Sequence, residues 1–406
     1  MLSRAGRTAA VALDPAVAPG RLARVRDLVR VPARAIVALA VCTASAVATL
    51  SAAPAASAAP TTFGDRGAYL AAAEDGVARI RQEWWNPKLG WYDTYRSSPS
   101  IVPLASAWDV YPLFEAVAAI ALADPTDANR AAVSEFGIGA ERYWNPDLQP
   151  LGGYGWYPDP QVTGQFAYFD DTGWLGIAFF DAYRATGDRR FLNDAIRAFR
   201  FIDIAGWAED AGGGIWWNTG HEYKTAEPLA AGALLGAEIY QRTHVKWYLR
   251  EAKKLIAWAD ANSWNSARRL YTRSDVSDTV MNYVEGMMIG AHVTLCRATR
   301  NRTWCRRAEQ LAEASAAAFP PEYHWAPETD VIYLRWLLDL YENVDDSRWY
   351  AVVDAKAQQA LAHARDENGL FTKRWDGGYA SQGRLLTVAA TVSLFAWVAA
   401  VPPPSQ

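Results

Sequence analysis

The stretch YRATGDRRFLNDA, residues 183–195, ends one predicted helix and begins the next. The pattern returns without gaps as YQRTHVKWYLREA at 240–252 and as CRATRNRTWCRRA at 296–308. Fainter copies start near 121 and at 341, so the repeat has a period of 45 to 62 residues. A period of this length accommodates a helical hairpin and a loop. The sequence therefore predicts an array of helical hairpins.

Each copy of the repeat contains a turn of the Thr-Gly-Asp type. Gly187 tolerates the left-handed conformation that ends a helix, and Asp188 can cap the helix that follows. The helix after the turn is amphipathic, with apolar residues at helical spacing from Phe191 to Ile202. The helix before the turn is apolar nearly all round, which is typical of a helix buried on several sides. Buried inner helices therefore alternate with outer ones.

Twelve helices are predicted along the chain. They span 66–84, 108–123, 127–143, 171–186, 188–203, 226–243, 245–262, 281–299, 302–318, 327–343, 346–365 and 384–400. Six inner and six outer helices predict an all-α fold, a closed (α/α)6 barrel in a single domain. An open solenoid is the alternative, but it would need polar capping repeats at its ends. The last helix is almost wholly apolar, so the first hairpin must cover it.

The first 58 residues differ in composition from the rest of the chain. A basic region with five arginines between 21 and 34 precedes an apolar run, Ala35 to Leu50, and a small-residue stretch from Ser51. This pattern predicts a secretory signal peptide at 1–58, a secreted protein, and one domain at 59–406 without a membrane span. An uncleaved anchor is one alternative, although the apolar run is shorter than the about 20 residues of a span. A lipoprotein signal at Cys42 is another, but Val41 fits it poorly.

The charge of the remaining chain restricts its partners. The first 58 residues hold 7 Arg and 2 Asp of the 40 basic and 44 acidic residues, which leaves 33 basic, 42 acidic and a formal charge of −9. Such a surface does not suit nucleic acid or anionic lipid. A neutral or cationic partner is expected, and we expect a monomer.

Two cysteines, Cys296 and Cys305, remain after the predicted cleavage, nine residues apart. In an exported protein such a pair is expected to be bridged. The bridge would be structural, clipping one helix to the next.

The loops that lead from outer to inner helices are long and rich in aromatic residues. They span 85–107, 144–170, 204–225, 263–280 and 366–383, and share one end of the ring, called here the long-loop end. They contain Trp85, Trp91, Trp144, Trp156, Trp207, Trp216, Trp217, Trp264 and Trp375. Flat rings with polar neighbours suit the faces of sugars, and loops on a rigid scaffold commonly carry function. The alternative is that these rings pack the loops onto the barrel.

Two adjacent carboxyl groups, Asp170 and Asp171, lie in YFDDTGW, residues 168–174, at the start of an inner helix. Helix capping is one interpretation, but a cap needs only one Asp. Glycoside hydrolysis needs a carboxyl pair. Repulsion and the surrounding aromatic rings would keep a proton on one Asp, while the other stays ionised near the helix amides. Because neighbouring carboxyl groups lie close together, we expect retention of configuration rather than inversion.

The segments YFDDTGW, AFFDAY at 178–183, GGGIWWN at 212–218 and YK at 223–224 resemble glycoside hydrolase family 76. The resemblance covers roughly residues 65 to 400. It implies an (α/α)6 barrel and the activity of α-1,6-mannanases and related transglycosidases. It also implies Asp170 as nucleophile and Asp171 as acid/base, with Trp216, Trp217 and Asn218 lining the sugar cleft.

The complete set of expected substrate-binding residues is Trp108, Asp109, Tyr168, Trp174, Trp216, Trp217, Asn218, Lys224, Tyr283 and Glu285. Two departures from the family pattern affect this set. Tyr283-Val284-Glu285-Gly286 stands where the family has Tyr-Asn-Gln-Gly, and Thr225 and Glu227 stand where amides are common. Glu285 is interpreted as a hydrogen-bonding residue at the cleft rim, with a third acid in the cleft as the alternative.

Other kinds of site are not indicated. The five His form no metal-binding motif, and neither a nucleophile elbow nor a phosphate-binding loop is present, so no metal and no cofactor are expected. Asp345-Asp346 is interpreted as a capping pair. The predicted function is a secreted, retaining endo-α-1,6-mannanase acting on a mannan polysaccharide or oligosaccharide. The alternatives are a mannan transglycosidase, a non-catalytic glycan-binding ring, and an epimerase or uronyl hydrolase.

Overall fold

The computed structural model describes residues 63–97, 102–320 and 325–405. The predicted signal peptide at 1–58 lies outside these residues. None of the helices in the described ranges is long and apolar enough to cross a membrane.

Two sets of six helices alternate along the part of the chain that the structure describes. The inner helices are α2 (Ala107–Ala123), α5 (Phe169–Thr186), α7 (Ala226–Thr243), α9 (Asn282–Thr299), α11 (Pro327–Val344) and α13 (Leu385–Ala400). The outer helices are α1 (Arg66–Trp84), α3 (Asp127–Ala140), α6 (Arg189–Ala205), α8 (Lys246–Asn262), α10 (Arg302–Ala318) and α12 (Ser347–His363). Short elements lie in the loops: η1 (Glu141–Tyr143), α4 (Pro160–Thr163) and η2 (Glu209–Ala211).

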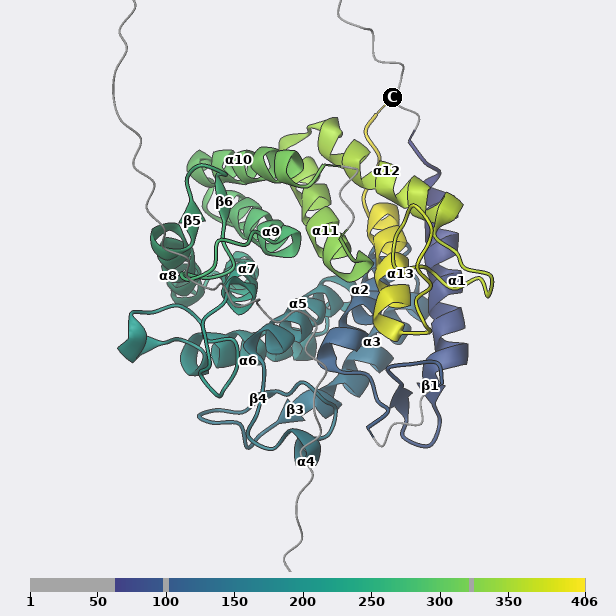
Figure 1. Ribbon diagram of the computed structural model, residues 1–406, viewed down its shortest axis with the longest axis horizontal. Coiled ribbons are helices and arrows are strands. Elements are labelled where there is room, and N and C mark those ends of the chain that lie inside the picture. Colours follow the sequence, from purple (N-terminus) through teal and green to yellow (C-terminus); the bar gives the residue numbers. More distant parts are fainter. Residues whose placement is uncertain (1–62, 98–101, 321–324, 406) are drawn as a thin grey trace, which may run out of the picture. The chain divides into compact units, whose positions relative to one another are not determined.

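The inner helices close into a ring, as the sequence predicts. Each packs against the next, from α2 through α5, α7, α9 and α11 to α13, and α13 packs in turn against α2 and α1. Figure 1 shows the outer helices α8, α10, α12 and α1 around this ring. The central helices are buried nearly all round; α13, for example, buries every residue from Leu385 to Ala399. The fold is therefore an all-α closed ring of hairpins.

The turns between inner and outer helices share one backbone feature. The residue after the inner helix is left-handed in four of them, with φ of 74° at Gly187, 58° at His244, 55° at Arg300 and 55° at Asp345. Only Gly187 takes this conformation without steric cost. The capping role predicted for Asp345-Asp346 is confirmed, because Asp345 is this left-handed residue and Asp346 accepts a hydrogen bond from the backbone of Arg348 in α12.

A disulfide joins Cys296 near the end of α9 to Cys305 in the first turn of α10. This is the predicted pairing. It holds the third copy of the repeat at the end of the ring opposite the long loops.

Three long loops contain short hairpins that the helix repeat does not predict. β1 (Trp85–Asn86) pairs with β2 (Trp91–Tyr92), β3 (Trp144–Asn145) with β4 (Gly153–Tyr154), and β5 (Trp264–Asn265) with β6 (Leu270–Tyr271). In each, a Trp faces a Tyr edge-on at 5.1 to 5.2 Å. An arginine of an outer helix lies over each Trp, 3.4 to 4.2 Å from the ring centre. These three tryptophans therefore pack the loops onto the outer helices.

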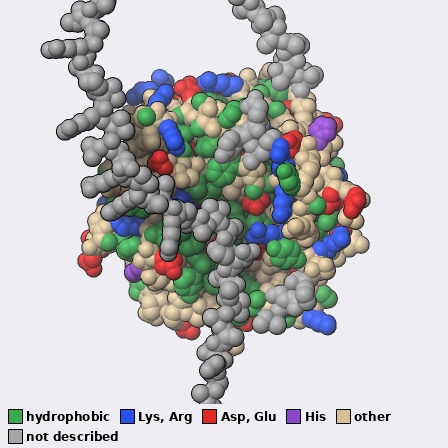
Figure 2. Space-filling view, viewed as in Figure 1, with side chains coloured by type: hydrophobic (Ala, Val, Ile, Leu, Met, Phe, Trp, Pro, Cys, Tyr) green, Lys and Arg blue, Asp and Glu red, His purple; other side chains and the backbone are tan. Residues whose placement is uncertain are grey.

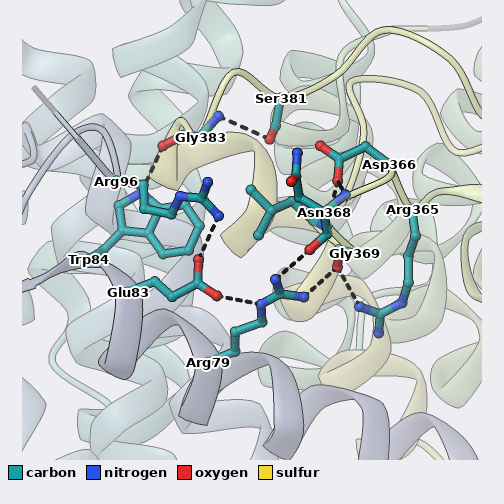
Figure 3. A network of polar contacts seen from close by, with 11 residues as sticks. Arg79, Glu83, Trp84, Arg96, Arg365, Asp366, Asn368, Gly369, Ser381 and Gly383 are labelled. Atoms are coloured by element: carbon teal, nitrogen blue, oxygen red, sulfur yellow. Dashed lines mark hydrogen bonds and ion pairs between the residues drawn. The ribbon is translucent and has the colours of Figure 1, made fainter.

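The long-loop end is also tied together where the last hairpin meets the first. Arg79 of α1 donates to the carbonyl oxygens of Asn368 and Gly369 at 2.6 and 2.7 Å, and to Glu83 at 2.7 Å. Trp84 Nε1 donates to the Gly383 carbonyl at 2.9 Å, and Figure 3 shows how these groups face one another. The loop before α13 is therefore held by side chains of α1.

A buried ion cluster joins three inner helices deeper in the ring. Arg335 of α11 pairs with Glu115 of α2 at 2.7 Å and with Asp181 of α5, and all three residues are at most 4% exposed. Trp397 Nε1 of α13 also donates to Glu115, at 3.0 Å. One arginine therefore connects helices from different sides of the ring.

Candidate active site

The inner helices present their first turns to one another at the long-loop end. Asp109 of α2 pairs with Arg384, which precedes α13, at 2.9 Å. Tyr283 of α9 donates to Glu227 of α7 at 3.2 Å, and Asn282 of α9 donates to Asp330 of α11 at 2.6 Å. The N-termini of these helices therefore converge where the long loops lie.

Acidic residues gather at this convergence. Among the described helices, five of the six inner ones carry an acid in the first turn: Asp109, Asp170 with Asp171, Glu227, Glu285, and Glu328 with Asp330. The positive ends of the helix dipoles favour negative charge here. The pair at Asp170 and Asp171, called here the acid pair, is part of this larger set.

The acid pair does not cap its helix from outside. The residue before α5 is Tyr168, which makes no side-chain capping bond, and both acids lie within the first helical turn. Asp170 Oδ1 accepts the backbone N–H of Asp171 at 3.1 Å. Helix capping therefore does not account for the two carboxyl groups.

The Asp170 carboxyl is partly buried and faces a second acid. Burial and then the charge of Glu227 raise the pKa of Asp170 to about 7. Hydrogen bonds act in the opposite direction, among them those from Trp217 Nε1 to Oδ2 at 3.1 Å and from the Asp171 backbone to Oδ1. Since both donors stabilise the ionised form, Asp170 is the acid of the pair prepared to carry charge.

Asp171 is more strongly biased toward its protonated form. It is 8% exposed, and burial, followed by the charges of Asp170 and Asp109, raises the pKa of Asp171 well above its ordinary value. Within the described residues, no donor bonds to its carboxyl oxygens. The two carboxyl groups therefore differ in surroundings: Asp170 has donors that stabilise a negative charge, whereas Asp171 is buried beside other acids.

Aromatic rings pack around the helical turn that follows the acid pair. Trp174, one turn along α5 from Asp171 and 2% exposed, packs 5.2 Å from Trp108 and 5.4 Å from Tyr111. Tyr283 lies 6.2 Å from Trp174 on the α9 side. These apolar surfaces exclude water from the carboxyl groups, which explains why burial is the largest effect on both.

A second aromatic group lies beside Asp170. The ring of Trp217 packs 4.7 Å from Tyr168 and 5.0 Å from Tyr223. The backbone reinforces this arrangement, because the Phe169 N–H donates to the Trp217 carbonyl at 2.9 Å. Trp217 is thus held on both sides while its N–H points at the carboxylate.

Several expected binding residues are engaged within the protein. Asp109 accepts the Ser106 hydroxyl at 2.6 Å and pairs with Arg384, while Lys224 donates to the Ala211 carbonyl. Trp216 stacks on His221 at 5.1 Å. Asn218 is fully buried, accepting from Gly220 and donating to Glu222, so it shapes its loop instead of lining an open surface.

The rim position expected for Glu285 is wrong. Its side chain is fully buried, and Oε1 accepts the backbone N–H of Tyr271 in β6 at 2.7 Å. Burial raises the pKa of Glu285 well above its usual range, and Oε2 has no partner among the described residues. Glu285 therefore anchors a loop hairpin from within the core. Its neighbour Tyr283, by contrast, does reach the acid pair's surroundings.

The third acid beside the pair is instead Glu227, in the first turn of α7. Its side chain is 3% exposed and accepts hydrogen bonds from the Tyr283 and Thr225 hydroxyls, and Arg273 Nε lies 3.2 Å away in an ion pair. Sequence reasoning noted Glu227 only as a departure from the family pattern and did not select Arg273. The position of Glu227 at the start of an inner helix, equivalent to that of the acid pair, was the signal that could have found it.

No group of three or more His, Cys, Asp and Glu side chains in the described residues is arranged to hold a metal ion.

Solved structures share this fold at low sequence identity. A family 76 glycoside hydrolase from a bovine Bacteroides thetaiotaomicron strain superposes with a TM-score of 0.74 at 20% identity, covering 82% of this chain and 77% of its own. The GH76A alpha-1,6-mannanase from Salegentibacter sp. HEL1_6 gives 0.67 at 18%, covering 82% and 99%. An inactive variant of that enzyme, with two consecutive aspartates changed to asparagine, in complex with alpha-1,6-mannotriose, gives 0.67 at 16%, covering 82% and 99%.

A closed ring of helical hairpins with an acid pair at the long-loop end defines a protein of the (α/α)6 glycoside hydrolase class. The model of glycosyl hydrolase family 76 matches residues 149–373, more than half of the chain, which therefore belongs to this family. None of the curated proteins matches the sequence.

Proposed function

We propose that the protein is a retaining endo-α-1,6-mannanase in which Asp170 is the nucleophile and Asp171 the acid/base. The observation that carries the proposal is the unequal environment of the two carboxyl groups. Asp170 receives the donors Trp217 Nε1 and the Asp171 N–H, whereas Asp171 is buried beside other negative charges. Family membership supports hydrolysis of a glycoside, and the Salegentibacter mannanase supports the α-1,6-mannan substrate.

The reaction follows from these environments. The Asp170 carboxylate attacks C1 of a mannosyl unit while Asp171 gives its proton to the leaving glycosidic oxygen, so the C–O bond breaks and a mannosyl ester of Asp170 forms. Asp171, now ionised, then takes a proton from a water molecule as that water attacks C1 and releases Asp170. Two displacements at C1 restore the original configuration. A sugar hydroxyl in place of water would give transglycosylation.

Unbranched α-1,6-mannan is the substrate that tests the proposal. We expect products of several chain lengths from the start of the reaction, and anomeric proton NMR should show the α-anomer first. Asp170→Asn and Asp171→Asn should each lower the rate by about 10³-fold or more, the scale found when a catalytic group is removed. Asp346→Asn, at the opposite end of the ring, is the control and should leave the rate unchanged. Release of the β-anomer first, or full activity in Asp170→Asn, would contradict the proposal.

The proposal includes export of the protein and action as a monomer. The basic, apolar and small-residue order of residues 1–58 supports export. N-terminal sequencing of protein recovered from culture medium should begin after Ala58. Sedimentation analysis of that material should give the mass of one chain.

A further inference from the structure

Glu227 is the charged group that acts most strongly on Asp170, although it belongs to another helix. It lies in the first turn of α7, which packs against α5. Its side chain is 3% exposed, so water screens its charge weakly. It has no place in the two displacement steps, which need only the acid pair.

Three groups hold the Glu227 carboxylate. The Thr225 hydroxyl donates to Oε2, and the Tyr283 hydroxyl donates to Oε1 at 3.2 Å. Arg273 Nε lies 3.2 Å from Oε1 in an ion pair. Burial, followed by the charges of Glu227 and Asp170, raises the pKa of Tyr283 far above its usual value, so Tyr283 remains a donor. Both oxygens of the Glu227 carboxylate are therefore held, Oε2 by Thr225 and Oε1 by Tyr283 and Arg273.

The cation in this cluster is paired with Glu227 and not with the acid pair. Within the described residues, the ion pair of Arg273 is with Glu227, and that of Arg384 is with Asp109. The donors to Asp170 are the uncharged N–H groups of Trp217 and Asp171. Each of the two neighbouring acids therefore has an arginine as its partner, whereas the acid pair has no ion pair with a cation in the described residues.

We propose that Glu227, held in place by Arg273, Thr225 and Tyr283, is a positioning residue that keeps the acid pair singly protonated at the pH where the enzyme works. This inference rests on the proposed function, since it assigns Glu227 a role in supplying the proton that Asp171 delivers. The titratable groups that face the pair are Glu227 from α7, Tyr283 from α9, Asp109 from α2, Tyr143 from η1, and Tyr168 and Tyr223 from the loops. Of the acids among them, Glu227 acts directly on Asp170.

The sign of the effect follows from electrostatics. A negative charge beside a carboxyl group favours its protonated form, so removing the charge lets the group lose its proton at lower pH. Glu227→Gln keeps the shape and the hydrogen-bonding oxygen but removes the charge. Both titration steps of the pair should then move to lower pH by about one unit, the size expected for charges about 12 Å apart at an effective dielectric near 20.

A titration without substrate tests this directly. The full chain carrying ¹³C at the aspartate carboxyl carbons is titrated by NMR, and Asp170→Asn and Asp171→Asn assign the two signals. Glu227→Gln should lower both midpoints by about one pH unit. Asp275→Asn removes an exposed acid from the loop that carries Arg273, so it serves as the matched control and should leave the midpoints unmoved. Superimposable curves for the wild type and Glu227→Gln would overturn the proposal.

The pH dependence of kcat/KM on unbranched α-1,6-mannan gives the second readout. Glu227→Gln should shift both limbs of the profile to lower pH. Glu227→Asp should give a smaller shift in the same direction, because the shorter side chain keeps the negative charge but places it farther from the acid pair. Should Glu227→Gln not fold, the Glu227→Asp titration decides, and unshifted midpoints there overturn the proposal. A uniform loss of rate with unmoved limbs would show a merely structural role. If the wild type does not cleave mannan, the proposed function fails while the titration still decides the role of Glu227.

Discussion

Trp217 Nε1 donates a hydrogen bond of 3.1 Å to Asp170 Oδ2 and thereby joins the loop before α7 to the first turn of α5. The same ring packs 4.7 Å from Tyr168, which precedes that turn. A single indole thus orients the carboxylate and restricts its access to water. On the uncovered part of the face shown in Figure 2, hydrophobic side chains gather toward the middle, with basic and acidic side chains interspersed around them.

Trp217→Phe keeps an aromatic ring but removes the N–H. A hydrogen bond to a charged group contributes about 1.5 to 3 kcal/mol, so kcat/KM on mannan should fall by about 10- to 100-fold. Since the lost donor favoured the ionised carboxylate, the pKa of Asp170 should rise and the acid limb of the pH profile should move to higher pH. Trp216→Phe is the comparison, because Trp216 stacks on His221 and has no bond to the pair. An unmoved acid limb in Trp217→Phe would exclude the orienting role.

Asp170→Asn should stabilise the protein at alkaline pH. The folded-state pKa of Asp170, about 7, lies above its ordinary value of 3.8, so the folded protein binds more protons between these values and its stability falls as pH rises through them. Replacing the carboxyl group should raise the free energy of unfolding by about 1 to 2 kcal/mol at pH 8 and have little effect near pH 4. Urea unfolding at both pH values measures this. Equal gains at the two pH values would contradict the electrostatic cause.

Arg335→Met should be strongly destabilising. The change leaves Glu115 and Asp181 buried without their cation, and breaking a buried pair in this way costs about 3 to 5 kcal/mol. Arg348→Met is the control, since Arg348 pairs with Asp346 and Glu313 at the surface and its side chain is 54% exposed. Its effect should stay within about 0.5 kcal/mol. Thermal unfolding of both variants measures this, and an Arg335→Met variant as stable as Arg348→Met would contradict a stabilising role for the buried cluster.

Glu285→Gln should leave kcat and KM unchanged, because Glu285 is buried and its Oε1 binds the Tyr271 backbone. An amide oxygen can accept the same hydrogen bond. The raised pKa of Glu285 means that the folded state loses stability as pH rises, so the neutral variant should gain stability at pH 8 relative to pH 5. A change in KM for mannan would instead place this residue in contact with substrate.

The ring itself could be predicted from the sequence, because each hairpin repeats the same turn. Helix boundaries follow the predicted ones closely, as in α1, α7 and α10. Two departures have local causes. α5 begins at Phe169 instead of 171, since the loop carbonyl of Trp217 accepts the Phe169 N–H, and the predicted 127–143 helix tightens into η1 before Trp144.

The loop structure was not predictable from the same signal. Strands of two residues are too short to show alternation, so the Trp-Asn hairpins escaped the sequence pattern. The sequence also could not predict which of the acids in the first turns of the inner helices lie beside the acid pair. Glu227 and Glu285 both lie near the start of an inner helix, but only the packing of β6 over Glu285 and the approach of Arg273 to Glu227 distinguish a core residue from a partner of the acid pair.

Because α13 completes the ring by packing between α2 and α1, the two halves of one interface are separated by most of the polypeptide. During synthesis on a ribosome, α2 is made long before residues 385–400, so its apolar flank has no packing partner until α13 emerges. A chain truncated before α13 should therefore expose this apolar flank of α2 and be prone to aggregation and proteolysis.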